Sequence, residues 1–115
     1  MGKKFTPKSD SVVVIGLGRF GQAVAQSLSQ LGHDVLGIDE RAEVVQELSA
    51  SLPHVVQANT TNVETLRQLN VTEFSHGVVA IGSDLEASVL SVLALSELGV
   101  PDIWAKAVTE RHGRI

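Results

Sequence analysis

The chain has 115 residues, which is enough for one domain with one hydrophobic core and too few for two. Hydrophobic residues make up 43% of it and charged residues 19%, so a disordered or collagen-like chain is excluded. The net charge of −4 offers no basic surface for nucleic acid, and the absence of cysteine excludes a disulfide framework, a thiolate nucleophile and a zinc–thiolate site.

The first ten residues are basic, but only about five apolar residues follow them, which is too few for a signal peptide. No stretch reaches the roughly 18 consecutive apolar residues of a membrane-spanning helix. We therefore expect a cytosolic protein in which residues 1–10 form a flexible tail and residues 11–115 form the domain.

Apolar residues follow strand and helix patterns in alternation along the chain. VVVIG at 12–16 is a β-branched run typical of a parallel strand covered on both faces, and the apolar spacing over 20–32 predicts a helix. The further predicted elements are, in order, a strand at 34–39, a helix at 41–51, a strand at 54–58, a helix ending near Leu69, a strand at 76–82, a helix ending at Leu98 and a strand at 102–108.

Strict alternation of strands and helices with short links predicts parallel strands joined by right-handed crossovers. The expected fold class is therefore α/β, a Rossmann-like doubly wound parallel sheet with strand order 3-2-1-4-5. Thr61 and Ser83, each followed three residues later by glutamate, are spaced as capping boxes that start the third and fourth helices. Thr109 resembles the cap of another helix, so we expect a sheet truncated before its final helix and strand.

Gly16, Gly18 and Gly21 form a G-x-G-x-x-G motif where a predicted strand passes into a helix. In this motif the first glycine allows a tight turn, the second lets a pyrophosphate approach the backbone, and the third lets the helix lie close to the strand. Asp39 ends the second predicted strand 18 residues after Gly21, near the spacing of about 20 expected of a carboxylate that binds a ribose diol. The alternatives are glycines that serve packing alone and an aspartate that caps the next helix.

Arg19 lies in the expected first turn of a helix, where a cation opposes the helix dipole. Bound phosphates would offset that cost. Because backbone N–H groups already hold the pyrophosphate of an ordinary dinucleotide site, the arginine indicates additional negative charge, such as a third phosphate or a ligand on a facing subunit. The alternative is a solvated surface arginine.

Five segments together resemble the N-terminal lobe of the regulator-of-potassium-conductance (RCK) domain, the TrkA-N family, and are most similar to the cytosolic gating subunits of Ktr-type potassium transporters. The segments are VVVIGLGRFG, GHDVLGID, QANTTNVETLRQLNV, GVVAIGSDLEASVL and VPDIWAKA. The resemblance runs from Val12 to His112 and implies a nucleotide-sensing regulatory subunit of a Ktr or Trk potassium uptake system that is not an enzyme.

The resemblance also implies ligands, partners and site residues. ATP or ADP is the implied ligand of Ktr-type members and NAD(H) that of Trk-type members. The lobes would pair as homodimers and form an octameric ring in the full-length protein, at the inner face of the membrane, beneath a potassium-translocating membrane subunit. Carried over by position, the binding residues are Gly16, Gly18, Arg19, Phe20 and Gly21 for phosphates, Asp39 for the ribose, Arg41 beside the adenine, Asn59 and Thr60 beside the base, and Ile81, Gly82 and Lys106 at the pocket floor and phosphate end.

Other interpretations of these residues stay open. Asn59 and Thr60 could form only turn and capping bonds, and Lys106 could meet a carboxylate in place of a ligand. The alternative function is the cofactor domain of an NAD-dependent oxidoreductase, although the chain has no tyrosine to act as a proton donor. Asp39 argues against NADP, whose 2′-phosphate it would repel. We expect Trp104 to lie in the core.

Overall fold

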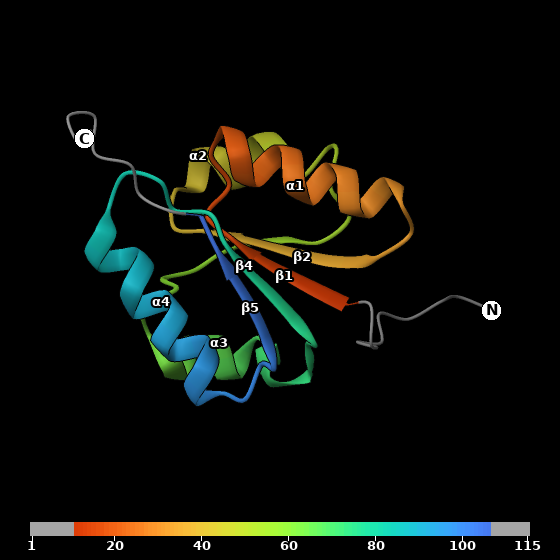
Figure 1. Ribbon diagram of the computed structural model, residues 1–115. Helices are drawn as coiled ribbons and strands as arrows, with labels where there is room; N and C mark the ends of the chain where they lie inside the picture. Colours follow the sequence, from red (N-terminus) through yellow and green to blue (C-terminus); the bar gives the residue numbers. More distant parts are fainter. Residues whose placement is uncertain (1–10, 107–115) are drawn as a thin grey trace, which may run out of the picture.

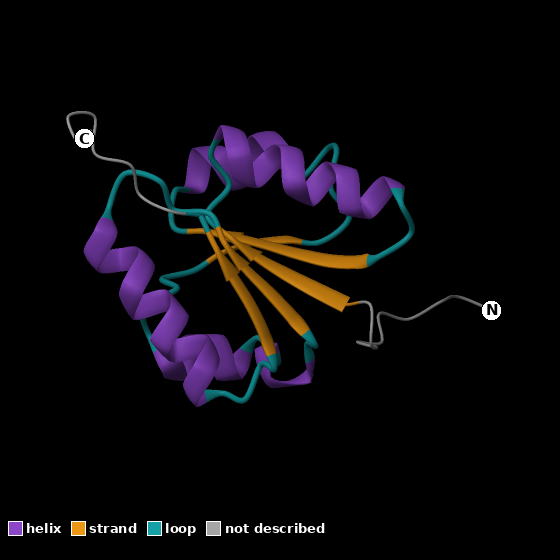
Figure 2. Ribbon diagram, in the orientation of Figure 1, coloured by secondary structure: helices purple, strands orange, loops and turns teal. Residues whose placement is uncertain are grey.

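The computed structural model describes residues 11–106, which form one sheet with helices on both faces (Figure 1, Figure 2). In chain order the elements are β1 (Ser11–Ile15), α1 (Arg19–Gln30), β2 (Asp34–Asp39), α2 (Ala42–Leu48), β3 (Val55–Gln57), α3 (Val63–Gln68), the 3-10 helix η1 (Val71–Glu73), β4 (His76–Val79), α4 (Leu85–Glu97) and β5 (Asp102–Ala105). The strand order is β3-β2-β1-β4-β5, and every neighbouring pair is parallel. The predicted Rossmann-like fold and its strand order are therefore confirmed.

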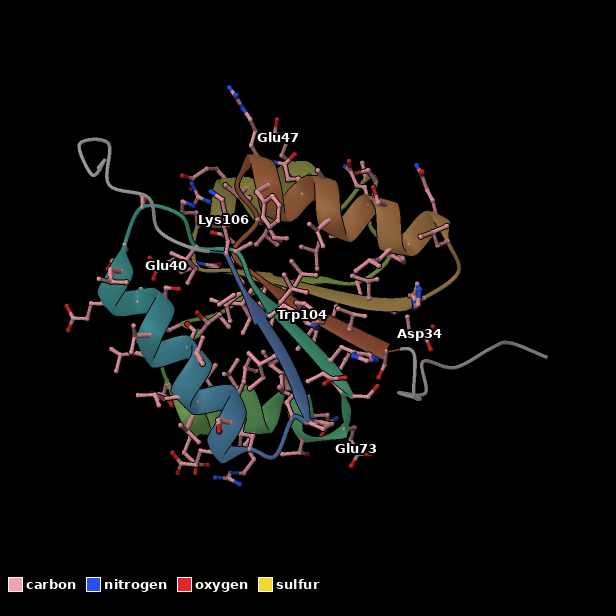
Figure 3. The ribbon with its side chains drawn as sticks, in the orientation of Figure 1. Asp34, Glu40, Glu47, Glu73, Trp104 and Lys106 are labelled. Carbon is pink, nitrogen blue, oxygen red and sulfur yellow. The ribbon has the colours of Figure 1, made fainter. Side chains whose placement is uncertain are left out.

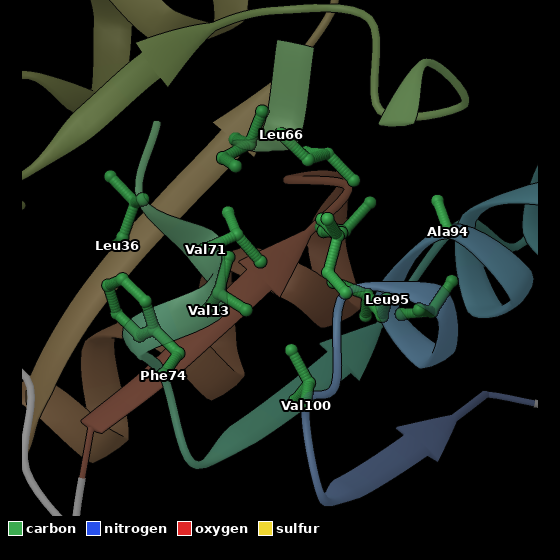
Figure 4. Packing of buried hydrophobic residues seen from close by; sticks show 12 residues of the cluster. Val13, Leu36, Leu66, Val71, Phe74, Ala94, Leu95 and Val100 are labelled. Atoms are coloured by element: carbon green, nitrogen blue, oxygen red, sulfur yellow. The ribbon is translucent and has the colours of Figure 1, made fainter. Parts of the chain in front are cut away.

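The central strand β1 is buried along its whole length because helices cover both of its faces. Val12 and Val14 belong to the core shared with α1 and α2, whereas Val13 and Ile15 belong to the larger core shared with α3, η1 and α4 (Figure 4). Alternate side chains of a strand point to opposite faces, so a continuous apolar run is what a sheet covered on both faces requires.

The two predicted capping boxes are wrong by one residue. The N-cap of α3 is Asn62, not Thr61, and the N-cap of α4 is Asp84, not Ser83. Each cap accepts a hydrogen bond from the main-chain N–H three residues on, at 3.1 Å in α3 and 3.0 Å in α4. Asparagine and aspartate are strong N-cap residues, so the Asx residue next along the chain takes the position.

The predicted burial of Trp104 is also wrong, because its side chain is 68% exposed. Trp104 is paired in register with Val78, whose side chain packs on the core beneath α1 and α2. Those helices lie on this same face, but over β1, β2 and β3, and leave this part of β5 uncovered (Figure 3). The adjacent Ile103 points to the opposite face and packs against the core beneath α4.

Several expectations fall on residues 1–10 and 107–115, outside the described part of the chain. They include the N-terminal tail, the end of the last predicted strand and the helix start at Thr109. Within residues 11–106, no helix has both the length and the apolar character needed to cross a membrane.

Candidate functional site

The glycine turn joins β1 to α1 and requires glycine at two positions. Gly16 has a φ of +95°, a conformation that side-chain-bearing residues rarely adopt. A Cβ at Gly21 would overlap the carbonyl oxygen of Gly16, so the third glycine lets the helix lie against the turn. Gly18 is the N-cap of α1, and a Cβ there would meet nothing within 4 Å. The start of α1 is therefore open on the side that Gly18 faces.

Asp39, the last residue of β2, points back beneath this turn. Its side chain is 4% exposed, and Oδ2 accepts a hydrogen bond of 2.7 Å from the main-chain N–H of Leu17. The guanidinium of Arg41 donates to both carboxylate oxygens at 2.9 Å, and the Arg41 main-chain N–H donates to Oδ1 at 2.9 Å. Burial alone raises the pKa of Asp39, but the hydrogen bonds from Arg41 and Leu17 outweigh it and hold this pKa below its usual range. The carboxylate is therefore ionised at neutral pH.

The floor of the site is main chain that the sheet holds in place. Immediately after the last residue of β1, β3, β4 and β5, a main-chain N–H still donates to a carbonyl of the neighbouring strand. These bonds run from Gly16 to Ile38 at 2.8 Å, from Ala58 to Asp39 at 3.1 Å, from Ala80 to Ile15 at 2.7 Å and from Lys106 to Val79 at 2.9 Å. The loops after β1, β3 and β4 therefore begin from a rigid base.

A pocket of about 440 Å³ lies at this carboxyl edge of the sheet, within the range of about 300–1,000 Å³ usual for small-molecule and cofactor sites. Its lining residues are Gly16, Gly18, Arg19, Ile38, Asp39, Glu40, Arg41, Asn59, Thr60, Thr61, Ala80, Ile81, Gly82, Ser83, Asp84, Ala87 and Lys106. Figure 3 shows Lys106 and Glu40 at this end of the sheet and Asp34 and Glu73 at the other. In doubly wound folds ligands bind at this edge, in the crevice between the first and fourth strands, where the strand order reverses.

The structure brings together every residue predicted for the site except Phe20 and Gly21. Gly21 contributes through packing, as described above, and Phe20 lies at 45% exposure beside the pocket. The Lys106 ammonium lies 5.6 Å from the centre of the Phe20 ring, a cation–π contact. A Cβ at Gly82 would come within 2.9 Å of Lys106 Nζ, so the lysine passes directly over that glycine.

The turn after β3 combines structural bonds with access to the pocket. Asn59 Oδ1 accepts hydrogen bonds from the main-chain N–H of Thr61 at 3.0 Å and from its hydroxyl at 2.7 Å. Thr60 is buried, and its hydroxyl bonds to that of Ser91 on α4 at 3.0 Å. The turn bonds considered for Asn59 are present, and Thr60 is tied to a helix that the sequence did not connect with it.

The sequence places residues 81–84 at this edge of the sheet, but Ser83 and Asp84 were not among the predicted site residues. Ser83 and Asp84 line the pocket, as does Ala87 in the first turn of that helix. The available signal was their position directly after a predicted buried strand, which places them at the same sheet edge as the glycine turn. In the described part of the chain, no group of three or more His, Asp or Glu side chains is arranged to hold a metal ion.

The TrkA-N domain model matches residues 12–115, nearly the whole chain. The chain belongs to the TrkA-N family. Two relatives are the Ktr system potassium uptake protein A of Bacillus subtilis, 39% identical over 108 residues, and that of Vibrio alginolyticus, 37% identical over 102 residues. These alignments cover 94% and 89% of the TrkA-N chain but 49% and 46% of the relatives, so the chain spans about half the length of the relatives it matches.

Solved structures place this TrkA-N domain among Rossmann-like folds. The NAD(P)-binding domain of an exopolyphosphatase-related protein from Archaeoglobus fulgidus has a TM-score of 0.75 at 22% identity, covering 89% of this chain and 76% of that one. The TrkA-N domain of the inner membrane protein ybaL from Escherichia coli has a TM-score of 0.63 at 17% identity, covering 90% of both. A short chain dehydrogenase/reductase family protein from Aeromonas hydrophila scores 0.67 at 15% identity, covering 78% of this chain and 52% of that one. At such identities these likenesses establish the fold alone.

Proposed function

We propose that this chain is the nucleotide-sensing lobe of a cytosolic regulatory subunit in a Ktr or Trk potassium uptake system. The lobe binds ATP or ADP, with NAD(H) as the second candidate, and does not catalyse a reaction. The observation that carries the proposal is the pocket at the carboxyl edge of the sheet, in a chain related to potassium uptake proteins. There the glycine turn and a buried carboxylate meet three cations, Arg19, Arg41 and Lys106.

The geometry supports a defined orientation of the nucleotide. The phosphates lie at the open start of α1, where N–H groups without helical partners and the positive end of the helix dipole favour anions. Arg19 and Lys106 line the same pocket and add two positive charges. The ribose lies at Asp39, and the base lies toward Asn59 and Thr60 after β3.

Arg19 favours a ligand with more than two phosphates. It is the first residue of α1, is exposed, and has no acidic residue in that turn to offset its unfavourable interaction with the helix dipole. A triphosphate within reach supplies the missing negative charge. ATP therefore ranks above a dinucleotide, because the helix start alone already holds the pyrophosphate of a dinucleotide.

The pocket contains little that a hydride-transfer enzyme requires. Among the described residues that line it there is no histidine, tyrosine or cysteine to donate a proton or polarise a carbonyl. The oxidoreductase alternative rests on fold likeness alone, so the regulatory function takes precedence.

Regulation requires two arrangements of the protein that bind nucleotide with different affinity. The outer face of α4 supplies a surface for such arrangements, because Leu85, Val89 and Leu93 are 61%, 48% and 57% exposed and recur every four residues. We assign this face to contacts between copies of the chain, in dimers and in a ring beneath the membrane subunit. A nucleotide bound at the start of the same helix then biases how the copies meet.

Thermal unfolding with ATP, ADP, NADH and NADPH tests the proposal. A ligand present at a hundred times its dissociation constant adds about 2.7 kcal/mol to the free energy of unfolding, and we expect ATP and ADP to give the largest shifts. Gly18→Ala is the control, because its Cβ touches nothing in the protein but projects where phosphates approach, so it folds and loses the shift. A preference for NADPH, or no response to any of the four, would refute the proposal.

A further inference from the structure

The carboxylate assigned to the ribose is already surrounded by donors from the protein itself. Asp39 accepts four hydrogen bonds, two from the main-chain N–H groups of Leu17 and Arg41 and two from the Arg41 guanidinium. An ionised carboxylate offers about four lone-pair positions, so these bonds fill its capacity. A ribose hydroxyl can donate to Asp39 only if one of the four donors withdraws.

Only the guanidinium is free to withdraw. The Leu17 N–H belongs to the glycine turn and the Arg41 N–H to the start of α2, so both are held by the backbone. Asp39 itself is 4% exposed and is held in place by these two main-chain donors. The Arg41 side chain, in contrast, is 51% exposed, lines the pocket and makes no capping bond to α2.

The surroundings of Arg41 also lower the cost of its release. Glu40 and Glu43 lie close enough to contribute to the raised pKa of Arg41, after the larger effect of its hydrogen bond to Asp39. A guanidinium that rotates off Asp39 therefore remains close to two other carboxylates and to solvent.

We infer that Arg41 is a specificity-determining residue that competes with the ribose hydroxyls for Asp39 and so weakens the dependence of the site on the 2′,3′-diol. The inference rests on the proposed function and deepens it. Each hydroxyl bond to Asp39 replaces a bond from Arg41 and does not add a new one, so the net gain from the diol is small in the wild-type chain. Removal of the guanidinium restores the full gain.

Calorimetric titration with ATP and 2′-deoxyATP tests this competition. The readout is the dissociation constant of 2′-deoxyATP divided by that of ATP, measured for the wild type, Arg41→Ala and Arg67→Ala. We expect a ratio within about threefold for the wild type, because the 2′-hydroxyl, the one group that 2′-deoxyATP lacks, contributes little net free energy. In Arg41→Ala we expect the ratio to rise to about tenfold and ATP itself to bind more tightly. A tenfold ratio corresponds to about 1.4 kcal/mol, the contribution of about one charge-assisted hydrogen bond.

Arg67→Ala is the matched control for the loss of one positive charge. Arg67 lies on α3, pairs with Glu64 at 3.3 Å and does not line the pocket, so its removal should leave the ratio unchanged. Arg41→Gln provides a second variant that keeps a polar side chain but loses the fork of two donors, and we expect an intermediate ratio. Both Arg41 variants keep the two main-chain hydrogen bonds to Asp39, so we expect them to fold. Thermal unfolding checks that all three variants are folded.

Three results distinguish the possible failures. If Arg41 flanks the adenine instead, Arg41→Ala weakens ATP and 2′-deoxyATP equally, the ratio stays at its wild-type value, and the inference is overturned. A wild-type ratio already near tenfold would overturn it as well, since the diol would then gain its full contribution with Arg41 present. A wild-type chain that binds neither nucleotide would refute the proposed function itself, and this inference with it.

Discussion

Replacement of Asp39 by asparagine isolates the contribution of its charge to stability. The two side chains have nearly the same shape, so no cavity forms, and the amide oxygen can still accept from Leu17 N–H. The amide NH₂ then faces the Arg41 guanidinium, donor against donor, and the bidentate ion pair is lost.

The size of the effect follows from the exposure of the two partners. A hydrogen bond to a charged group contributes about 1.5–3 kcal/mol, but Arg41 is 51% exposed and its share is screened by solvent. We therefore expect Asp39→Asn to lower the free energy of unfolding by about 1–2 kcal/mol at pH 7. For a domain of this size, that is a decrease in Tm of about 4–8 °C.

The pH dependence gives a second, independent measurement. Because the pKa of Asp39 is lowered in the folded protein, its contribution is fully present above the unfolded-state pKa of about 3.9 and is lost as the pH falls through the folded-state pKa. Urea unfolding of both proteins between pH 7 and pH 3 should therefore show a constant difference down to about pH 4 and a shrinking one below it.

Asp34→Asn is the matched control, since Asp34 begins the same strand at the opposite end of the sheet (Figure 3). It removes the same charge, and we expect a change within about 0.5 kcal/mol. An Asp39→Asn protein as stable as the wild type at pH 7, or a difference that persists unchanged to pH 3, would show that the charge of Asp39 is not what the surrounding donors stabilise.

Three other predictions address the phosphates, the glycine turn and α4. Arg19→Ala should weaken ATP more than NADH in calorimetry, and equal losses would contradict the role of this arginine at an additional phosphate. Gly21→Ala should lower the free energy of unfolding by about 3 kcal/mol or more, because its Cβ overlaps the main chain of the turn. Gly18→Ala should change that free energy by no more than about 1 kcal/mol. Equal effects of the two variants in chemical unfolding would contradict the observed close approach. Thr60→Val and Ser91→Ala should each lower the free energy of unfolding in urea by about 1–2 kcal/mol, because each leaves the other, buried hydroxyl without its partner. The double variant should lose less than the sum of the two single losses. Strict additivity would show that the two hydroxyls do not interact.

The order of elements could be predicted because it follows from local patterns. The strand order could be predicted because alternating strands and helices with right-handed crossovers form a doubly wound sheet. The β-branched run of β1 and the glycines after it determine a buried strand, a tight turn and a helix within a few residues of one another. The carboxyl edge then follows from topology, which explains why residues as far apart as Gly16, Asp39 and Lys106 could be assigned to one place. Their assignment as ligand contacts stays a prediction.

The features that escaped prediction depend on competition or on distant partners. Asp84 and Ser83 are both good N-caps, and only the path of the chain after β4 decides between them. The bond between Thr60 and Ser91 joins residues 31 positions apart, and no local pattern indicates it. The expected burial of Trp104 is wrong because burial in an edge strand depends on which helices extend that far across the sheet.

The main-chain hydrogen bonds that continue past the strand ends affect the free energy with which any ligand binds in the pocket. A floor whose amides are already ordered loses little conformational entropy on association, so more of the contact energy remains as affinity. Such a floor also does not move when a ligand binds. Any conformational change that follows binding must therefore arise in the side chains and helix starts above it.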